Sequence, residues 1–473
     1  MIAKRILPGL AALALLAAMP AAAEPAHIPE KALPVVKELQ AKALAGGSPG
    51  YALVESLTTE VGPRLTGTPG DAAAVKWAVA KFKELGFDKV WTEPVVYKGW
   101  IRGTEKAAIT APFPQNLVIT GLGYTVATPP GGVEAEVAYF ASYEELLAAP
   151  EGSLNGKIAF VNEVMIRHTQ GHGYGFIGAM RGDGPVQAAR RGASALLIRS
   201  LGTHSHRFPH TGVTEHDEGV RVVPSAALSP PDADQLRRII VDRGQTVRVK
   251  LELATEFPGQ VTTHNVIGEL RGRETPDEIV LIGAHLDSWD LGTGALDDGA
   301  GVGIVMGAGK LIRDLPKRPR RTVRVVLFAA EEIGLVGAKA YAEAHKDSLA
   351  KHVIATEADF GAGPIYALST YVHPDAEPAL TVIRRALGPL RIIAGDKRAT
   401  GGPDVSVLRA QGVPVVSLQM DGSDYFDYHH TPDDTFDKVD RAKLEQSIAA
   451  YATFTWLAAE ATGTFGPISP PGK

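Results

Sequence analysis

The chain has 473 residues, of which 45% are hydrophobic and 21% are charged, with no cysteine and a formal net charge of −5. This composition is typical of a globular protein, and the absence of cysteine excludes a disulfide scaffold, a thiol nucleophile and a thiolate-bound metal. The acidic net charge argues against nucleic acid as a partner, because it repels a phosphate backbone.

Residues 1–23 have the pattern of a secretory signal peptide. A basic pair, Lys4-Arg5, precedes an apolar stretch over residues 6–19, and alanines at 21–23 come before Glu24. A membrane anchor is the alternative, but the apolar stretch is shorter than the roughly 20 residues that a spanning helix needs. We therefore expect a periplasmic or secreted protein with no stable membrane anchor after the signal is cleaved.

Residues 24–258 divide into two segments of different pattern. Residues 24–124 predict the first part of an α/β domain, whereas 125–258 predict an inserted β-rich domain in which strand-like runs outnumber helices. The expected helices are 32–44, 71–85, 185–191 and 232–243, and the expected strands are 90–97, 107–109, 117–119, 134–141, 157–161, 194–198, 221–223 and 246–253.

Residues 259–473 predict the second part of the α/β domain. Apolar, β-branched runs alternate with helical stretches, which is typical of a mixed, mostly parallel sheet with helices on both faces. The expected strands are 278–284, 322–329, 353–357 and 413–418, and the expected helices are 301–315, 335–345, 378–387 and 441–462.

Histidine and acidic residues follow the ends of these four strands. Ligands of open α/β sheets bind beyond the carboxyl ends of the strands, so we expect these side chains to meet. Each alone has a simpler reading as a turn residue or as an acid at a helix start, but together they predict a metal centre. The residues are His285 and Asp287, Asp297 and Asp298, Glu331 and Glu332, Asp359, and His429 and His430.

The residue types suit metal-assisted acid–base chemistry. His285 and Asp287 lie two apart on an extended chain and point to one side, so that one can ligate while the other orients it. A carboxylate can bridge two metal ions, which polarise a carbonyl and lower the pKa of water. In the pair Glu331-Glu332, one carboxylate can be a ligand and the other a base that passes a proton to a leaving amine.

Four segments carry a resemblance to the M28 family of di-zinc aminopeptidases. These are residues 283–290 (GAHLDSWD), 294–299 (GALDDG), 330–332 (AEE) and 429–435 (HHTPDDT). The resemblance extends over nearly the whole chain after residue 23 and places 125–258 as the family's protease-associated insert. It implies a zinc aminopeptidase-like fold, an exopeptidase acting on dipeptides or short peptides, and a homodimer.

The resemblance also implies roles for individual residues. It implies two zinc ions held by terminal ligands and one bridging carboxylate, with another carboxylate as the general base; cobalt and manganese are alternatives for the same donors. The terminal ligands are His285, Glu332, Asp359 and His430, the bridging ligand is Asp297, the base is Glu331, and the acid behind His285 is Asp287. The peptide from Asp297 to Asp298 is implied to be cis.

Several assignments stay open at this stage. His429 is the rival of His430 as the final ligand. A distant branch of the family has a tyrosine before the last ligand that steadies the oxyanion, but His429 stands there, so His429, Tyr425 and Tyr428 are all candidates. Arg398 is a candidate for binding a substrate carboxylate in a bidentate fork. Recognition of a free amine or of a free carboxylate is not decided.

Other functions were weighed against the peptidase. A non-catalytic binding or receptor protein on the same scaffold would lack the ligands, which are present here. A glutaminyl cyclase-like acyl-transfer enzyme would lack the insert. The insert also contains a tract of four histidines. It could store metal ions, or it could form a loop beside the active site. The four residues are His204, His206, His210 and His216.

Overall fold

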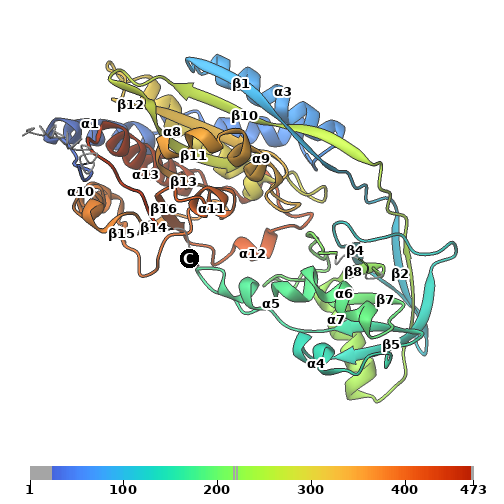
Figure 1. Cartoon of the computed structure of the whole chain (residues 1–473). Helices are drawn as coiled ribbons and strands as arrows, with labels where there is room; N and C mark the ends of the chain where they lie inside the picture. Colours follow the sequence, from blue (N-terminus) through green and yellow to red (C-terminus); the bar gives the residue numbers. More distant parts are fainter. Residues whose placement is uncertain (1–23, 217–218, 220–221, 470–473) are drawn as a thin grey trace, which may run out of the picture.

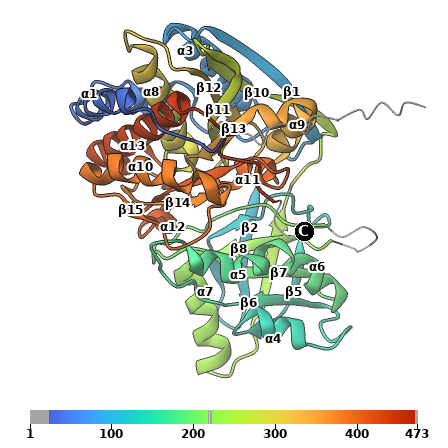
Figure 2. The same ribbon diagram turned by 60° about the vertical axis from the view of Figure 1, so that its left-hand side comes forward.

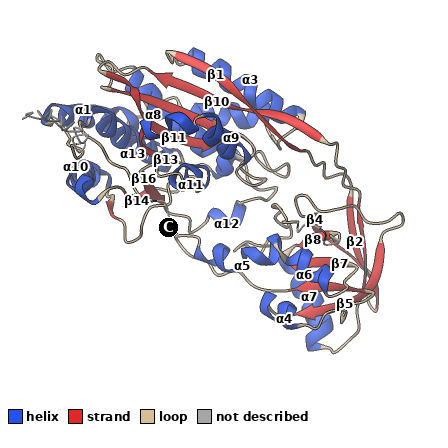
Figure 3. Ribbon diagram, in the orientation of Figure 1, coloured by secondary structure: helices blue, strands red, loops and turns tan. Residues whose placement is uncertain are grey.

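The computed structural model describes residues 24–216, 219 and 222–469, so the predicted signal peptide lies outside the described residues. The chain forms two domains, each built on an eight-stranded mixed sheet (Figures 1 and 3). We call the sheet that contains β1 and β10–β16 the first domain, and the sheet that contains β2–β9 the second domain. Across the described ranges, no helix combines the length and apolar character needed to cross a bilayer.

The first domain has the strand order β1-β10-β12-β11-β13-β16-β14-β15. The pairs β12–β11, β11–β13 and β13–β16 at its centre are parallel, whereas β1–β10, β10–β12 and β16–β14 are antiparallel. The strands are β1 (Lys89–Lys98), β10 (Gln260–Leu270), β11 (Thr275–His285), β12 (Arg321–Phe328), β13 (His352–Glu357), β14 (Ile365–Tyr371), β15 (Ile393–Ala394) and β16 (Val415–Met420). The mixed sheet that the sequence predicts is therefore confirmed.

Helices cover both faces of this sheet, as predicted. Val280 and Ile282 of β11 pack into the core that α8 and α13 share, while Ile279 and Leu281 pack into a second core with α9 and α11. Because successive side chains of a strand point to opposite faces, a strand buried on both reads as a continuous apolar run. The helices are α1 (Leu33–Leu44), α2 (Gly50–Ser56), α3 (Pro69–Glu84), α8 (Ala300–Arg313), α9 (Val336–Ala344), α10 (Glu377–Leu387), α11 (Pro403–Arg409), α12 (Tyr425–Tyr428) and α13 (Arg441–Glu460).

The second domain has the strand order β3-β2-β9-β5-β6-β7-β8-β4. Its strands are β2 (Glu105–Ala111), β3 (Gln115–Leu117), β4 (Ile119–Gly121), β5 (Val133–Phe140), β6 (Lys157–Val161), β7 (Ala195–Arg199), β8 (Ser225–Leu228) and β9 (Arg248–Leu253). Its helices are α4 (Tyr143–Ala148), α5 (His172–Gly182), α6 (Gly184–Arg190) and α7 (Pro230–Arg237). Strands β2–β4 precede residue 125, so this sheet includes residues outside the predicted insert; the assignment of 125–258 to a protease-associated domain stays a prediction.

Two expected strands differ from the structure. The run at 117–119 predicts one strand, but Val118 is in no strand and separates β3 from β4. The run at 221–223 predicts a strand because of its β-branched residues, but Val222 and Val223 are not in a strand and β8 begins at Ser225. Pro224 lies between them and has no backbone N–H to give to a strand ladder. Pairing with β7 therefore starts after the proline.

The two domains meet near the carboxyl end of β11. Trp100, from the connection between β1 and β2, packs with Trp289 and Leu65 in a small apolar cluster. Arg102 donates two hydrogen bonds to Asp290, from Nε to Oδ2 (2.8 Å) and from a terminal nitrogen to Oδ1 (2.7 Å). Figure 2 shows α12 where the domains approach each other. These contacts join the second domain to the loop that follows β11.

The buried centre of the first sheet predicts a large effect of cavity formation. We expect Ile282→Ala to lower the free energy of unfolding by about 3 kcal/mol, because Ile282 is fully buried in the core between the sheet and helices α8 and α13. Ile393→Ala is the matched control, since Ile393 is 66% exposed, and its effect should stay within about 0.5 kcal/mol. Denaturant midpoints of the three proteins measure the difference, and equal midpoints for both variants would contradict the buried position.

Candidate metal centre

The carboxyl ends of the central parallel strands bring the predicted ligands to one edge of the first sheet. His285 ends β11, Glu331 and Glu332 follow β12, and Asp359 follows β13. These strands are neighbours in the sheet, so their ends lie side by side. The fourth contributor is the loop after β16, which contains α12 and His430.

The carboxylate of Asp297 lies between two histidines. Its Oδ1 is 3.0 Å from His285 Nε2 and its Oδ2 is 3.2 Å from His430 Nε2. Asp359 Oδ1 lies 3.8 Å from His285 Nε2, and Glu332 Oε2 lies 2.9 Å from His430 Nε2. The ring nitrogens and carboxylates thus form two groups that share Asp297, with one of its oxygens facing each group. This is the arrangement that a bridging carboxylate requires.

The hydrogen bonds of the two adjacent histidines distinguish them. His430 Nδ1 is 3.1 Å from the carbonyl oxygen of Thr211, and the backbone N–H of Thr211 donates to the carbonyl of His430 at 2.9 Å. This bond places the proton on Nδ1 and leaves the lone pair of Nε2 for a metal, which is how ligating histidines are oriented. His429 Nε2 is 3.4 Å from Asp297 Oδ2, and its Nδ1 is buried with no partner among the described residues. The geometry favours His430 as the ligand.

Asp434 holds the backbone on which Asp297 stands. Its Oδ1 accepts a hydrogen bond from Leu296 N at 2.6 Å, and its Oδ2 accepts one from Asp297 N at 3.2 Å. Asp298 plays a similar part for β11, accepting from His285 N at 3.0 Å and from Gly301 N at 3.1 Å. The Asp297–Asp298 peptide is cis, as the resemblance implies.

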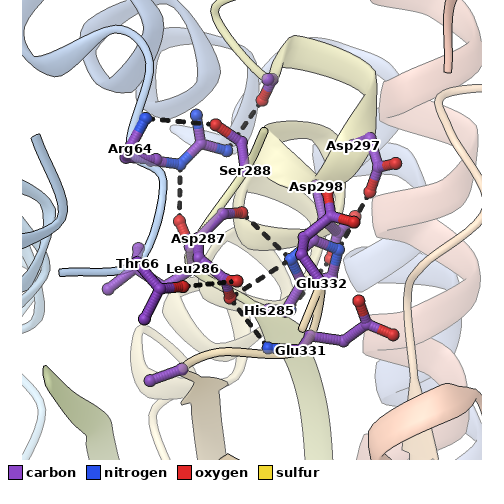
Figure 4. A network of polar contacts seen from close by, with 12 residues as sticks. Arg64, Thr66, His285, Leu286, Asp287, Ser288, Asp297, Asp298, Glu331 and Glu332 are labelled. Atoms are coloured by element: carbon purple, nitrogen blue, oxygen red, sulfur yellow. Dashed lines mark hydrogen bonds and ion pairs between the residues drawn. The ribbon is translucent and has the colours of Figure 1, made fainter. Parts of the chain in front are cut away.

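Arg64 holds the loop between β11 and Asp297 through hydrogen bonds to its backbone (Figure 4). The guanidinium is fully buried and donates to the carbonyl oxygens of Leu286 (2.5 Å), Thr293 (2.7 Å) and Gly294 (2.8 Å). Gly294 has a φ of 60°, and a Cβ there would lie 2.7 Å from Arg64 Nη1 and 2.4 Å from the Cβ of Ser288. A glycine is therefore required where the arginine passes the loop.

Asp287 connects His285 to Glu331. Its backbone oxygen is 3.0 Å from His285 Nδ1, whereas its nearer carboxylate oxygen is 3.7 Å from that atom. The carboxylate instead accepts from Glu331 N at 3.1 Å and from the hydroxyl of Thr66 at 2.9 Å (Figure 4). Asp287 therefore lies behind His285 as expected from its sequence position, and it also fixes the peptide of Glu331, which the sequence does not reveal.

The cluster carries more negative charge than its own cations balance. Desolvation raises the pKa values of the Glu331 and Asp359 carboxyls well above their usual range, and the neighbouring carboxylates add to both rises. Burial also raises the pKa of Asp297, but hydrogen bonds from His285 and His430 outweigh it and hold that pKa well below its usual value. Glu332 Oε1 is buried with no partner among the described residues. Excess carboxylate oxygen, unpartnered atoms and imidazole nitrogen together fit a divalent cation.

A cleft of about 390 Å³ lies beside this cluster. Asp297, Glu331, Glu332 and His430 line it from the first domain, and Tyr174, Arg181 and Val213 line it from the second domain. Both domains therefore contribute to the walls of the same cleft.

Comparison with known proteins identifies the family. Residues 265–455 match Peptidase family M28. Carboxypeptidase Q of Mus musculus is 34% identical over 410 residues, which cover 87% of this chain and 85% of that protein. The chain belongs to peptidase family M28. It is therefore a peptidase, and its Glu331 and metal-ligand candidates lie on the part of the chain that the family match covers.

Two solved structures agree with the fold. A peptidase M28 precursor from Shewanella amazonensis SB2B is 50% identical, covers 93% of this chain and 99% of its own, and superposes with a TM-score of 0.91. BSAP, a zinc aminopeptidase from Bacillus subtilis, is 17% identical and covers 89% of this chain and 98% of its own with a TM-score of 0.62. At that identity the second likeness supports the M28 fold alone.

The remaining predicted residues fall in different places around the M28 cleft. Tyr425 is buried, lines the cleft and packs with its ring 5.0 Å from that of His429. Tyr428 does not line the cleft, and its ring lies 5.7 Å from the Nζ of Lys438. This position argues against Tyr428 as an oxyanion donor. Arg398 lines a separate cavity of about 620 Å³ that adjoins the cleft through Asp359, Phe360 and Pro403.

The histidine tract of the second domain does not form a metal store. His210 Nδ1 accepts a hydrogen bond from Leu201 N at 2.7 Å, His216 Nε2 lies 3.0 Å from the carbonyl oxygen of Tyr124, and His204 stacks on Phe208. In the described part of the chain, no metal-ligand group includes His204, His206, His210 or His216. The tract instead shapes the loop that carries Thr211.

The support of Asp297 predicts a loss of metal affinity when Asp434 is removed. We expect Asp434→Ala to weaken binding of a divalent metal by about 10- to 100-fold, because two backbone donors lose their acceptor and Asp297 loses its fixed position. Asp433→Ala is the matched control, since Asp433 is partly exposed and pairs with Lys438. Competition with a chromophoric chelator measures both affinities, and equal affinities would refute the role of Asp434.

Proposed function

We propose that this M28 peptidase is a zinc-dependent exopeptidase that hydrolyses dipeptides or short peptides in the periplasm or outside the cell, as a homodimer. The observation that carries the proposal is the Asp297 carboxylate, whose two oxygens face His285 and His430 in a cleft that Glu331 also lines. Carboxypeptidase Q and the zinc aminopeptidase are named for opposite ends of a peptide, so their likeness supports an exopeptidase without choosing the end.

Two groups of side chains would hold the metal ions. His285 and Asp359 would hold one, Glu332 and His430 the other, and Asp297 would serve both. Imidazole nitrogen and carboxylate oxygen are donors that zinc accepts, and cobalt and manganese accept the same set. When bound, such ions polarise a peptide carbonyl and lower the pKa of water.

Glu331 is the base of the proposed reaction. The backbone N–H of Glu331 donates to the Asp287 carboxylate, and Glu331 lines the cleft beside the ligand candidates. Desolvation raises its pKa well above the usual value, and bound metal cations would act against this rise and favour the ionised carboxylate that a base requires. Glu331 takes one proton from the attacking water and passes it to the nitrogen of the leaving amine.

Two side chains are candidates for donating a hydrogen bond to the oxygen that becomes negative. Burial raises the pKa of the Tyr425 hydroxyl well above its usual value, so Tyr425 keeps its proton at neutral pH and can donate. His429 lies beside it and reaches the same cleft. Both residues are retained in the proposal. The variants Tyr425→Phe and His429→Gln, measured separately, distinguish them, because loss of the donor lowers kcat.

Hydrolysis of simple dipeptides tests the proposal as a whole. We expect the zinc-loaded protein to cleave free dipeptides and to lose this activity when a chelator removes the metal. Loss of cleavage on blocking only the amine would assign aminopeptidase-type recognition, and loss on blocking only the carboxylate would assign carboxypeptidase-type recognition. No cleavage of any peptide by protein that holds two metal ions per chain would refute the proposed function.

Replacement of the base gives a second test. We expect Glu331→Gln to lower kcat by about 100- to 10,000-fold while the metal content stays unchanged, because the amide cannot take a proton. Glu343→Gln provides the control, since the Glu343 side chain is 73% exposed on α9 and lies outside the cleft. Wild-type turnover in a zinc-loaded Glu331→Gln protein would show that another group is the base.

A further inference from the structure

The backbone that carries the proposed base adopts a conformation that is unfavourable for its sequence. Ala330, which precedes Glu331, has a φ of 57°, in the left-handed region that favours glycine. A strained residue of this kind persists only where the surrounding contacts hold it in place. The position of Glu331 therefore depends on the hydrogen bonds of its own peptide groups.

Two kinds of hydrogen bond hold these peptide groups. The carbonyl oxygen of Glu331 accepts from Gly334 N at 2.8 Å and from Leu335 N at 2.9 Å, and both donors belong to the same turn of the chain. The backbone N–H of Glu331 donates to Asp287 Oδ1 at 3.1 Å. Asp287 lies in the loop after β11, so this second bond relates the base to His285, at which β11 ends.

The other oxygen of the Asp287 carboxylate is held by Thr66 (Figure 4). The Thr66 hydroxyl donates to Asp287 Oδ2 at 2.9 Å, and both residues are buried. With one donor on each oxygen, the plane of the carboxylate is fixed and Oδ1 stays directed at the N–H of Glu331. Loss of the hydroxyl would leave Oδ2 as a buried anionic oxygen without this donor, which favours rotation of the carboxylate.

Contacts of the preceding residues hold Thr66 beside this loop. Arg64 N donates to Ser288 Oγ at 3.2 Å, and Ser288 N donates to the carbonyl oxygen of Arg64 at 3.4 Å. Leu65 packs with Trp289 in the small apolar cluster where the domains meet. The backbone before Thr66 is therefore tied at two points to the loop after β11, and its hydroxyl is presented from a fixed position.

Thr66 does not belong to the residues that line the cleft, so it can influence the reaction through Asp287 and not by touching a substrate. It also lies before residue 265, where the match to the M28 family begins. The family match therefore gives no role to this residue, and its role is inferred from its contacts alone.

Resting on the proposed function, we propose that Thr66 is a positioning residue for the base. Its hydroxyl sets the rotation of the Asp287 carboxylate, and that carboxylate sets the place of the Glu331 peptide beside the metal-ligand candidates. Turnover should therefore depend on a hydroxyl group that contacts neither the substrate nor a ligand candidate.

Replacement of the hydroxyl tests this role. We would measure kcat and KM of the zinc-loaded full chain for alanyl-alanine. Thr66→Val puts a methyl group of similar size in place of the hydroxyl and should lower kcat by about 10- to 100-fold, while KM and zinc content stay like the wild type. Thr66→Ser keeps a hydroxyl and should retain most of the wild-type kcat. An equal fall in both variants would contradict a role of the hydroxyl.

A matched control removes a hydroxyl that serves a different carboxylate. The Thr370 hydroxyl donates to Glu377 Oε1 at 2.7 Å, and neither residue lines the cleft. We expect Thr370→Val to keep the wild-type kcat even where its melting temperature falls as far as that of Thr66→Val. Equal losses of kcat in the two variants would mean that the fall reports general destabilisation, and would overturn the assignment.

A double-variant cycle tests the path through Asp287. In a protein that already carries Asp287→Ala, Thr66→Val should change kcat little, because the carboxylate that the hydroxyl orients is gone. Independent, multiplicative losses from the two substitutions would show that Thr66 acts by another route.

Hydrogen exchange gives a readout that does not depend on activity. Exchange of the Glu331 backbone amide, followed by mass spectrometry of the zinc-loaded protein, should be faster in Thr66→Val than in the wild type, because its acceptor turns away. Thr66→Ala takes the place of Thr66→Val if the latter does not fold. Unchanged exchange with wild-type kcat would refute the positioning role. No hydrolysis by wild-type protein with two metal ions would instead reject the proposed function, and the exchange rates would still decide whether Thr66 holds the base.

Discussion

The burial of Asp297 between two histidines is the constraint on which the rest of the structure depends. A buried carboxylate is stable only when its oxygens are partnered, and here both are turned towards imidazole nitrogens that a metal would share. Three further acidic residues hold the backbone of the site through their N–H groups. Asp434, Asp298 and Asp287 accept hydrogen bonds from the backbone N–H groups of Asp297, His285 and Glu331 respectively.

Arg64 is a buried cation that is likewise partnered by backbone groups. It is fully buried near this cluster, yet its guanidinium donates to carbonyl oxygens and not to the carboxylates. Burial lowers its pKa, and the surrounding carboxylates act against that change from a distance. The arginine therefore ties the loop that holds Asp297 without neutralising the ligands. Because Arg64 holds the loop without contacting the ligand carboxylates, these carboxylates stay available for metal cations.

The sequence was sufficient for the parts of the fold that depend on local pattern. Strands β11, β12 and β13 are apolar on both faces, and their ends carry the ligand candidates, so both could be read from the order of residues. Strands β10 and β14 mix polar and apolar residues along their length and were not predicted. Residues that position the site were also missed, because their partners are distant. Arg64 contacts Leu286, Thr66 contacts Asp287 and Thr211 contacts His430 across 222, 221 and 219 residues.

The reciprocal hydrogen bonds between Thr211 and His430 also tie the two domains together at the candidate metal centre. Thr211 belongs to the second domain, whereas His430 follows β16 of the first domain. A relative movement of the two domains at this point would break these bonds and release the ring of His430 from its present orientation. The bonds that orient one imidazole therefore make its orientation sensitive to the position of the other domain.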